Sequence, residues 1–281
     1  MNKSIIVKDN SLISASYSMN VIEQRIILLA IAKSRKNQIP LSPIQYINIS
    51  VDEYVSNFNI EGHSVYENIK AGCRQLFNRE FRYIKPDGTK VLSRWISSIQ
   101  YHDKNGSLSL LFSPELIPFI SELEKRFTSY FLKDISKLSS SYAIRLYELI
   151  IAWKSTHKTP IFEISYFRES LGVACDEYLD IRNFKKRVLD VAINQINEHS
   201  NIQVECEQHK KGRRITGFSF NFIELKEPKR DPNTIDWIDT DKKPKREKMT
   251  MNQIVSKHPQ ETVGKTEPEI YKMFGTIYHI I

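Results

Sequence analysis

Glycine is scarce in this sequence, and its scarcity argues against a large class of enzymes. The chain of 281 residues holds nine glycines and no GxxxxGK[ST] pattern. A phosphate-binding loop needs glycines because backbone N–H groups must closely approach the phosphate oxygens. The sequence therefore predicts no ATPase site of the usual phosphate-binding-loop kind.

Cysteine and histidine are few and poorly placed for metal binding. The three cysteines, Cys73, Cys175 and Cys206, lie far apart and form no CxxC pair. Such a scattered odd set argues against zinc and against a disulfide framework, and it is typical of a reducing cytosol. None of the seven histidines has the spacing of the metal-binding pair of rolling-circle nicking enzymes, and no GxSxG or HExxH pattern occurs. We therefore expect a binding protein rather than an enzyme, without metal or cofactor.

Long apolar runs are also missing. The longest, residues 26–32, is far shorter than the roughly 18 residues of a membrane span. The N-terminus has no apolar core of the kind found in secretory signals. We therefore expect no membrane anchor and a cytoplasmic location.

Positive charge is what the sequence has in excess. Lysine and arginine total 41 against 33 aspartate and glutamate residues, which leaves a formal net charge of +8. Hydrophobic residues make up 41%, enough to build proper cores. A basic excess favours a polyanionic partner, because neutralised phosphates release their counterions. The alternative is a merely soluble basic protein.

The same order of elements is predicted twice along the chain. Each half begins with a long apolar helix, over residues 20–35 and then 139–155, with caps expected at Asn20 and at the serines before the second helix. Each continues with a short strand, a short helix, a second long helix and β strands; a Ser64–Glu67 capping box would start the second helix of the first half. This order is typical of a winged helix, a helix-turn-helix followed by a β hairpin. Arg25 would correspond to Arg145, and Ile49-Ser50 to Ile164-Ser165.

We therefore predict an α+β protein of two tandem winged-helix domains. Residues 1–130 would form the first domain and residues 131–225 the second, with residues 113–138 joining them. Residues 226–281 read as a charged linker and a short, partly disordered tail. The run KKPKREK in this tail is interpreted as a solvated linker rather than a DNA contact.

The helix over residues 183–199 is the candidate for reading DNA bases. Its apolar residues fall on one broad side, and the opposite side carries polar residues: Asn183, Lys186, Arg187, Asp190, Asn194 and Asn197. Such side chains can hydrogen-bond to base edges, and the basic residues, Lys185 included, gather at the end that enters the major groove in helix-turn-helix proteins. Taken alone, the stretch is better explained as an ordinary solvated helix, with Asp190 as an i,i+3 partner of Arg187; the elements around it favour the reading helix.

The turn after this helix adds further cations. Lys210, Lys211, Arg213 and Arg214 lie in one predicted hairpin, where they would face phosphates. In the first half, Lys70 and Arg74 are the matching outward candidates, with Arg79, Arg82 and Arg94 nearby. For these first-half residues, exposed solubilising side chains are an equally good interpretation.

Three stretches resemble one known family. They are VIEQRIILLAI, LIPFISELEKRFTSYFLKDISKLSSSYAIRLYELI and FKKRVLDVAINQINEHSNIQVECEQHKKGRRITGFSF, in this order between residues 6 and 222. They are similar to the initiator (Rep) proteins of iteron-containing, theta-replicating plasmids, most of all those of Acinetobacter-like plasmids.

The resemblance implies a bacterial protein that binds direct repeats in double-stranded DNA at a plasmid origin. The second winged helix would be the main reader, through residues 183–197 and 210–214. The first would add DNA contacts and pair subunits in a homodimer, which often represses its own gene. Host helicase and initiator proteins would be partners at the origin. A winged-helix transcriptional regulator, which would bind inverted repeats in a promoter, is the alternative.

Overall fold

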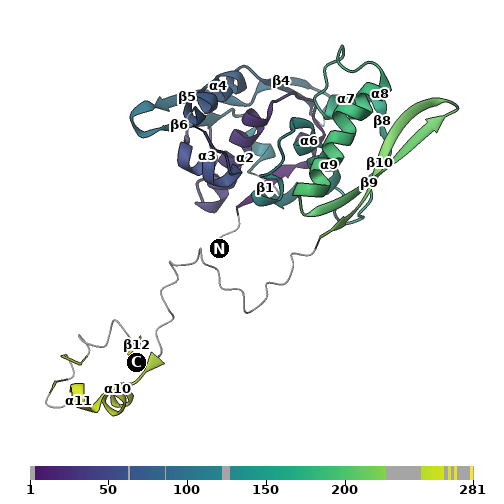
Figure 1. The fold of residues 1–281 in the computed structure, drawn as a ribbon. Helices are drawn as coiled ribbons and strands as arrows, with labels where there is room; N and C mark the ends of the chain where they lie inside the picture. The colour runs from purple at the N-terminus through teal and green to yellow at the C-terminus, as the bar shows by residue number, and fades with distance from the viewer. Residues whose placement is uncertain are drawn as a thin grey trace. The chain divides into compact units, whose positions relative to one another are not determined.

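The computed structural model describes residues 4–62, 64–85, 87–121, 127–225, 248–262, 265–266, 269–270 and 279–280. Residues up to Glu227 form one compact unit, and residues from Pro228 onward form another. The first unit contains the predicted element order twice, side by side (Figure 1). The buried apolar side chains of the two copies form one continuous cluster, so both copies share a core.

The first copy is a helix-turn-helix with a three-stranded sheet in the order β2-β6-β5. A separate hairpin, β3 (Glu80–Ile84) with β4 (Lys90–Arg94), stands beside this sheet. From the sequence, one strand is expected over residues 91–101; in the structure it is broken at Trp95, whose ring is buried in the core. The remaining elements of this copy are α2 (Val21–Lys36), β2 (Ile47–Ser50), α3 (Val51–Phe58), α4 (Val65–Phe77), β5 (Ile96–His102), η1 (Asp103–Asn105), β6 (Ser107–Phe112) and η2 (Ile117–Phe119).

The second copy has the same plan, with a sheet in the order β8-β10-β9. Its last two strands make a long hairpin that extends beyond the body of the domain (Figure 1). Its elements are α6 (Ser141–Ile151), β8 (Phe162–Glu163), α7 (Ile164–Ser170), α8 (Ile181–Phe184), the π-helical turn η3 (Lys185–Leu189), α9 (Asp190–His199), β9 (Ile202–Lys211) and β10 (Arg214–Glu224).

Equivalent contacts in the two copies support a duplication. Arg25 of α2 lies over the ring of Phe58, the last residue of α3, at 5.0 Å. Arg145 of α6 donates to the carbonyl of Ser170, the last residue of α7. Each first helix thus uses one arginine to hold the end of the next helix.

The two hairpins repeat a second contact. His102 Nε2 lies 2.9 Å from Ser109 Oγ, and His209 Nε2 lies 2.8 Å from Ser219 Oγ. In each hairpin the serine lies two residues beyond the residue directly opposite the histidine. Both histidines therefore lock their hairpin by the same diagonal bond.

The predicted pairing of Ile49-Ser50 with Ile164-Ser165 is wrong by two residues. Ser50 is the N-cap of α3, whereas Ser165 lies inside α7, whose N-cap is Glu163. In both copies the last strand residue is the N-cap of the helix, so Ser50 corresponds to Glu163.

Of the three helix caps expected from the sequence, the one at Asn20 is confirmed and the two serine caps are wrong. Asn20 and Glu23 form the expected reciprocal capping box at α2. The Ser64 side chain makes no cap bond, because its backbone (φ −101°, ψ 18°) lacks the extended conformation of a typical N-cap. The serine side chains before α6 make no cap bond either. Gln195 of α9 accepts the N–H groups of residues 139 and 140, which precede the helix.

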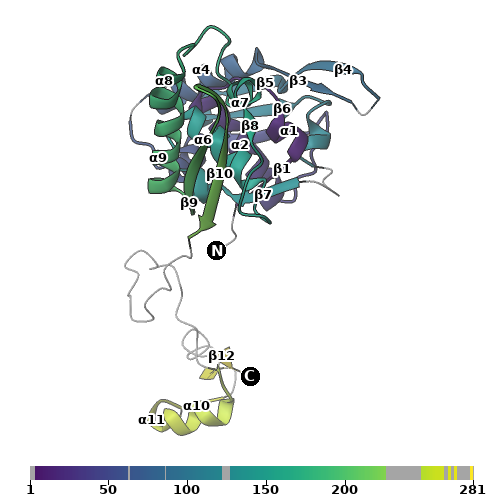
Figure 2. The ribbon, with the colours of Figure 1, turned by 90° about the vertical axis from the view of Figure 1, so that its right-hand side faces the viewer.

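An N-terminal strand ties the two copies together. β1 (Ile5–Asp9) pairs antiparallel with β7 (Phe127–Phe131), and α1 (Asn10–Ser14) follows β1 directly. α5 (Leu132–Ile135) follows β7 and leads toward α6. The first strand therefore lies beside the segment that joins the copies, as Figure 2 shows.

A buried ionic cluster forms where these elements meet. Lys8 Nζ lies 2.6 Å from Glu148 Oε1, and Arg145 Nη1 lies 3.0 Å from Glu148 Oε2. Tyr130 donates to the same carboxylate at 2.5 Å, and Tyr17 bonds to Arg145 and lies under its guanidinium. Arg145 and Glu148 are each 1% exposed and Lys8 is 3% exposed. A fully hydrogen-bonded carboxylate between two cations makes this burial tolerable.

Two arginines complete the connection reciprocally. Arg145 donates to the carbonyls of Ile13 and Ala15, in the segment that enters the first copy. Arg25 donates to the carbonyls of Ser136 and Leu138, in the segment that enters the second copy. Each copy therefore fixes the chain where it enters the other.

The second unit is described only in short pieces. β11 (Lys248–Met249) pairs parallel with β12 (His279–Ile280), and α10 (Met251–Lys257) and α11 (Pro259–Thr262) follow β11. The predicted charged linker over residues 226–248 lies outside the described residues except for its last residue, as does most of the predicted disorder. Across the described ranges, no helix combines the length and apolar character needed to cross a bilayer.

Replacing Glu148 with glutamine should lower the free energy of unfolding by about 3–5 kcal/mol, measured by urea denaturation. The substitution leaves the Lys8 and Arg145 charges buried without a counter-charge. The matched control is Glu224→Gln, which breaks an ion pair with Lys154 of similar length (2.5 Å) but greater exposure. That change should cost less than about 1 kcal/mol. Equal losses of unfolding free energy in the two variants would show that the buried cluster contributes no more than an exposed ion pair.

The cluster should also make folding sensitive to acid. Burial raises the pKa of Glu148, but the charges of Lys8 and Arg145 outweigh burial and hold it below its ordinary value of 4.5. A carboxyl group with a lowered pKa in the folded state contributes stability above its unfolded pKa, and this stability is lost as pH falls through the folded pKa. The free energy of unfolding should therefore fall below about pH 4.5, and less steeply in Glu148→Gln.

Candidate nucleic-acid interface

The candidate reading helix is one continuous helical run from α8 through η3 to α9, along the outside of the second copy (Figure 2). Its buried residues recur every fourth position, at Phe184, Val188, Ala192 and Ile196. The opposite face is exposed and carries five of the predicted residues: Asn183, Lys186, Arg187, Asp190 and Asn194. The amphipathic pattern is confirmed, and its polar face is free for a ligand.

A π-helical turn falls on the basic residues of this run. The N–H of Asp190 bonds to the carbonyl of Lys185, five residues back. Such wide turns are rare and occur often at functional sites. Here the ammonium of Lys185 turns to β9 and donates to Gln208 Oε1 at 2.9 Å, whereas Lys186 and Arg187 stay exposed. Lys185 thus joins the helix to the hairpin, and its predicted DNA contact stays a prediction.

Asn197 was predicted on the outward face, and this is wrong. Its Oδ1 accepts the N–H of Val204 at 2.7 Å, and its Nδ2 donates to the carbonyl of Val204 at 3.1 Å. The cause is the short connection after α9, which brings β9 back alongside the helix. Asn197 therefore fixes the hairpin to the helix.

Lys186 and Arg187 on this face have no acidic partner among the residues that the structure describes. Neither Lys186 nor Arg187 forms an ion pair with any residue that the structure describes, and the alternative Arg187–Asp190 pair is absent there. Unpaired cations on an ordered helix are available to phosphates or base edges.

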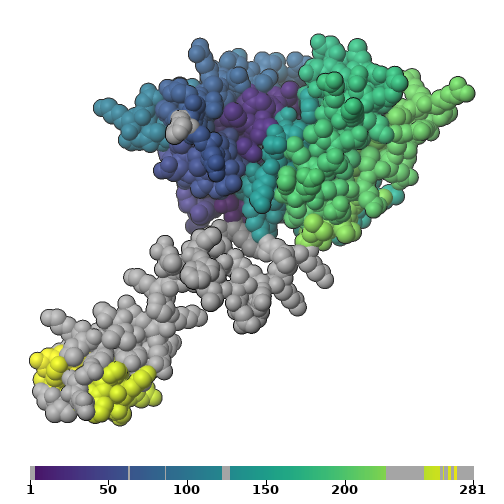
Figure 3. Space-filling model, in the orientation of Figure 1, coloured from purple at the N-terminus to yellow at the C-terminus, as the bar shows by residue number. Residues whose placement is uncertain are grey.

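The hairpin tip is strongly cationic, as predicted. Lys210, Lys211, Arg213 and Arg214 are all exposed around Gly212, whose positive φ of 63° makes the turn. Lys211 and Arg214 lie directly opposite each other across the strands. Like charges in such a pair destabilise a hairpin. The tip projects beyond the rest of the domain (Figure 3), where a polyanion could offset the repulsion.

Arg182 is an exposed cation that the sequence reasoning missed. It lies in the first turn of the reading helix, and its side chain is 90% exposed. Asp180, the N-cap, accepts from both Nε and Nη2 of Arg182. These bonds raise the pKa of Arg182 and lower that of Asp180. The D-x-R spacing at the helix start was the signal available in the sequence.

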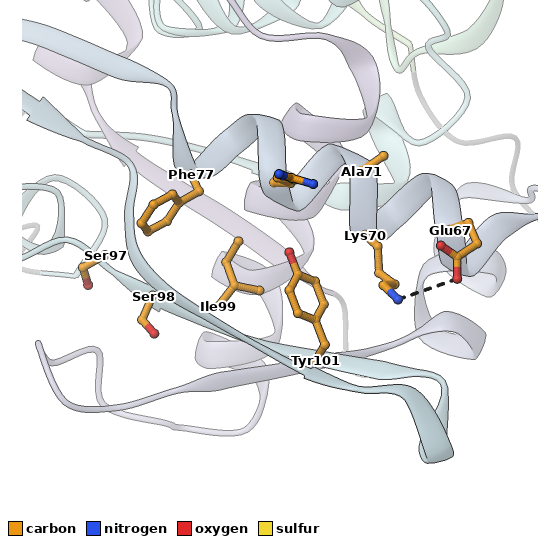
Figure 4. A pocket seen from close by; sticks show the side chains of 9 residues that line it. Glu67, Lys70, Ala71, Phe77, Ser97, Ser98, Ile99 and Tyr101 are labelled. Carbon is orange, nitrogen blue, oxygen red and sulfur yellow. Dashed lines mark ion pairs between the residues drawn. The ribbon is translucent and has the colours of Figure 1, made fainter.

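The matching helix of the first copy, α4, offers a different surface. Lys70 and Arg74 line a groove of about 660 Å³ between α4 and β5, with Phe77, Ile99 and Tyr101 (Figure 4). Lys70 Nζ lies 3.1 Å from Asp103 Oδ1 and 3.7 Å from Glu67 Oε1. The hydrogen bond to Asp103 raises the pKa of Lys70.

The other arginines of the first copy are partly engaged as well. Arg79 pairs with buried Glu23 at 2.9 Å, and Arg94 donates to the carbonyl of Phe77. Arg74 is exposed and Lys70 is half-buried. DNA contact by Lys70 and Arg74 stays a prediction, and the internal pairs make this helix the weaker of the two candidates.

Metal ligands are not gathered in the described part of the chain. No three histidine, cysteine, aspartate or glutamate side chains there come close enough to hold an ion. The three cysteines are free thiols.

Two protein-family models match this architecture. The first, described as "Initiator Replication protein, WH1", matches residues 5–151, more than half of the chain. The second, described as "Initiator Rep protein, WH2", matches residues 163–222. The chain belongs to the initiator Rep protein family. The resemblance found in the sequence and the fold of two tandem winged helices are thereby confirmed.

Several Rep-family relatives are similar to this chain. A replication initiation protein of Escherichia coli is 23% identical over 220 residues, 76% of this chain and 67% of the relative. The PI protein of Escherichia coli is 33% identical over 144 residues, 46% of this chain and 47% of that protein. A crystal structure of Pi initiator protein in complex with iteron DNA superposes with a TM-score of 0.68 at 25% identity, and it covers 81% of this chain and all of that one.

Two finer predictions remain untested by these relatives. The match to the first winged-helix model runs on through α6, so the division of this Rep protein near residue 130 stays a prediction. The likeness to Acinetobacter-like plasmids also stays a prediction.

A substitution that removes the repulsion between cations at the hairpin tip should stabilise the folded protein. Arg214→Glu places opposite charges across from each other and should raise the free energy of unfolding by about 0.2–1 kcal/mol, measured by urea denaturation at low salt. The gain should shrink as salt screens the pair. Lys90→Glu on β4, which lies opposite Ile84, is the control and should leave stability unchanged. A loss of stability in Arg214→Glu would show that the tip is not strained by charge.

Proposed function

We propose that this protein initiates plasmid replication by binding direct repeats in double-stranded origin DNA. The single observation that carries this proposal is an ordered helix on which Lys186 and Arg187 are exposed and make no ion pair with the described residues, followed directly by a cationic hairpin, in a chain of the initiator Rep family. The likeness to the Pi initiator bound to iteron DNA supports the same target. The proposed role is binding without catalysis.

The two winged helices are proposed to divide the work. The second domain, residues 131–225, reads bases through Asn183, Lys186, Arg187, Asp190 and Asn194, and holds phosphates through its hairpin tip. The first domain, residues 1–130, makes only auxiliary contacts through α4. Its share is smaller because Lys70 of α4 is already engaged by Asp103 and Glu67. Helix-turn-helix heads occupy sites about one helical turn apart, so each repeat should span about two turns of DNA.

Subunit pairing and host partners belong to the same proposal. A homodimer made through the first domain would repress the protein's own gene, and a monomer would open the origin and recruit the host helicase and initiator in the bacterial cytoplasm. The shared family is what supports these roles.

Footprinting on the DNA that flanks the gene tests the proposal. We expect protection of several direct repeats beside an AT-rich stretch. Protection of inverted repeats in a promoter alone would identify a transcriptional regulator instead. Protection of no repeated site would exclude both.

Arg187→Ala should weaken binding to the specific repeat by about 1–3 kcal/mol and binding to random DNA much less, if Arg187 contacts a base. Titration of both DNAs at one salt concentration measures the difference. Lys154→Ala removes the same charge from a lysine already paired with Glu224 and serves as the control. Equal losses on both DNAs would show that Arg187 contacts phosphate.

Lys210→Ala and Lys211→Ala should each weaken binding to every DNA alike. Each should also reduce the steepness of the salt dependence of affinity by about one, because one fewer counterion is released. The slope of log affinity against log salt concentration measures this. An unchanged slope would remove the hairpin tip from the phosphate-binding surface.

A further inference from the structure

The loop before the reading helix presents a leucine to solvent. Leu179 is 77% exposed and lies in the loop between α7 and α8, two residues before the helix begins. A single exposed leucine is common on protein surfaces and by itself indicates nothing. The loop that carries this leucine has a backbone fixed by several contacts, yet the leucine side chain itself is exposed.

Three contacts fix the backbone around Leu179. Arg168 of α7 donates to the carbonyl of Tyr178 at 2.9 Å and also to the carbonyl of Glu177. Tyr178 adopts a left-handed conformation (φ 46°), which a bulky residue keeps only when its surroundings impose it. Its ring meets that of Tyr142 edge-on at 6.5 Å.

The same contacts join the loop to the reading helix. The guanidinium of Arg168 also lies over the ring of Phe184, 5.2 Å from its centre. Asp180, next to Leu179, accepts the N–H of Arg182 at 2.8 Å and caps the helix. Leu179 is therefore carried on a preformed element at the start of the helix, as a contact residue requires.

Arg182 is presented by the same element. Asp180 holds its Nε and Nη2, so the orientation of the guanidinium is set while 90% of the side chain stays exposed. Nη1 makes no bond to any residue in the described part of the chain. An oriented arginine is suited to the O6 and N7 acceptors of guanine, and an apolar side chain to the 5-methyl group of thymine.

We propose that Leu179 and Arg182 form a second base-reading element, in which Leu179 contacts a thymine methyl group and Arg182, positioned by Asp180, contacts a guanine. This inference rests on the proposed binding to repeat DNA and adds two specificity positions to it. Three residues of chain span at most about 10 Å, and base pairs are stacked at about 3.4 Å, so the two bases should lie within about three steps.

Replacing single thymines of the repeat by deoxyuridine tests Leu179, because only the methyl group is removed. The wild-type protein should lose affinity about fourfold at one thymine, the effect of one buried methyl group. Leu179→Ala should bind the normal repeat more weakly and show no further loss at that thymine. If every deoxyuridine that weakens the wild type also weakens Leu179→Ala equally, Leu179 is not the reader.

Replacing single guanines by 7-deazaguanine tests Arg182 in the same way. Loss of the N7 acceptor should weaken wild-type binding about tenfold at one position within three steps of that thymine, and Arg182→Ala should be insensitive there. Asp180→Asn should keep the guanine preference but reduce it, because the arginine is then less firmly oriented. Sensitivity of Arg182→Ala equal to that of the wild type would overturn its role.

Two controls distinguish base reading by Leu179 and Arg182 from an effect on folding and from a failure of the proposed function. Ile44→Ala removes an apolar side chain that is 86% exposed in the first copy and should leave every profile unchanged. Unfolding midpoints of Leu179→Ala and Arg182→Ala should match the wild type, since both side chains are exposed. If the wild type binds the repeats but no substituted base distinguishes the variants, this inference fails while the proposed function stands; if the wild type does not bind the repeats, the proposed function fails first.

Discussion

The structure depends on the buried carboxylate of Glu148. It is held between Lys8 from the first strand and Arg145 from its own helix, with Tyr130 from the joining segment. Three parts of the chain that are distant in sequence therefore meet at one negative charge. Because any missing partner leaves a buried charge uncompensated, the arrangement of these three parts is strongly constrained.

This constraint also concerns DNA recognition. Arg145 holds the segment entering the first winged helix, and Arg25 holds the segment entering the second. The two winged helices thus share one core and one set of polar contacts at their junction. A fixed distance between two reading heads is what lets a single chain measure a repeat of defined length.

Helix starts and faces were predictable because their causes are local. Asn20 with Glu23 caps α2 as expected, and the four-residue spacing of Phe184, Val188, Ala192 and Ile196 marks the buried face. The failures have tertiary causes. β9 takes Asn197 away from the outward face, and Gln195 of α9 bonds to the backbone just ahead of α6, where the serines make no cap bond. Asp103 engages Lys70, whose DNA contact stays a prediction.

The sequence by itself determined the repeated winged-helix plan, the amphipathic reading helix and the cationic hairpin, because these follow from periodicity, turn residues and local charge. Only the tertiary structure decided which cations are free. Lys185 and Lys70 are engaged by residues from other elements, whereas Lys186 and Arg187 remain exposed and make no ion pair with the described residues. Partners that lie far away in sequence are brought close by folding, and no local pattern records them.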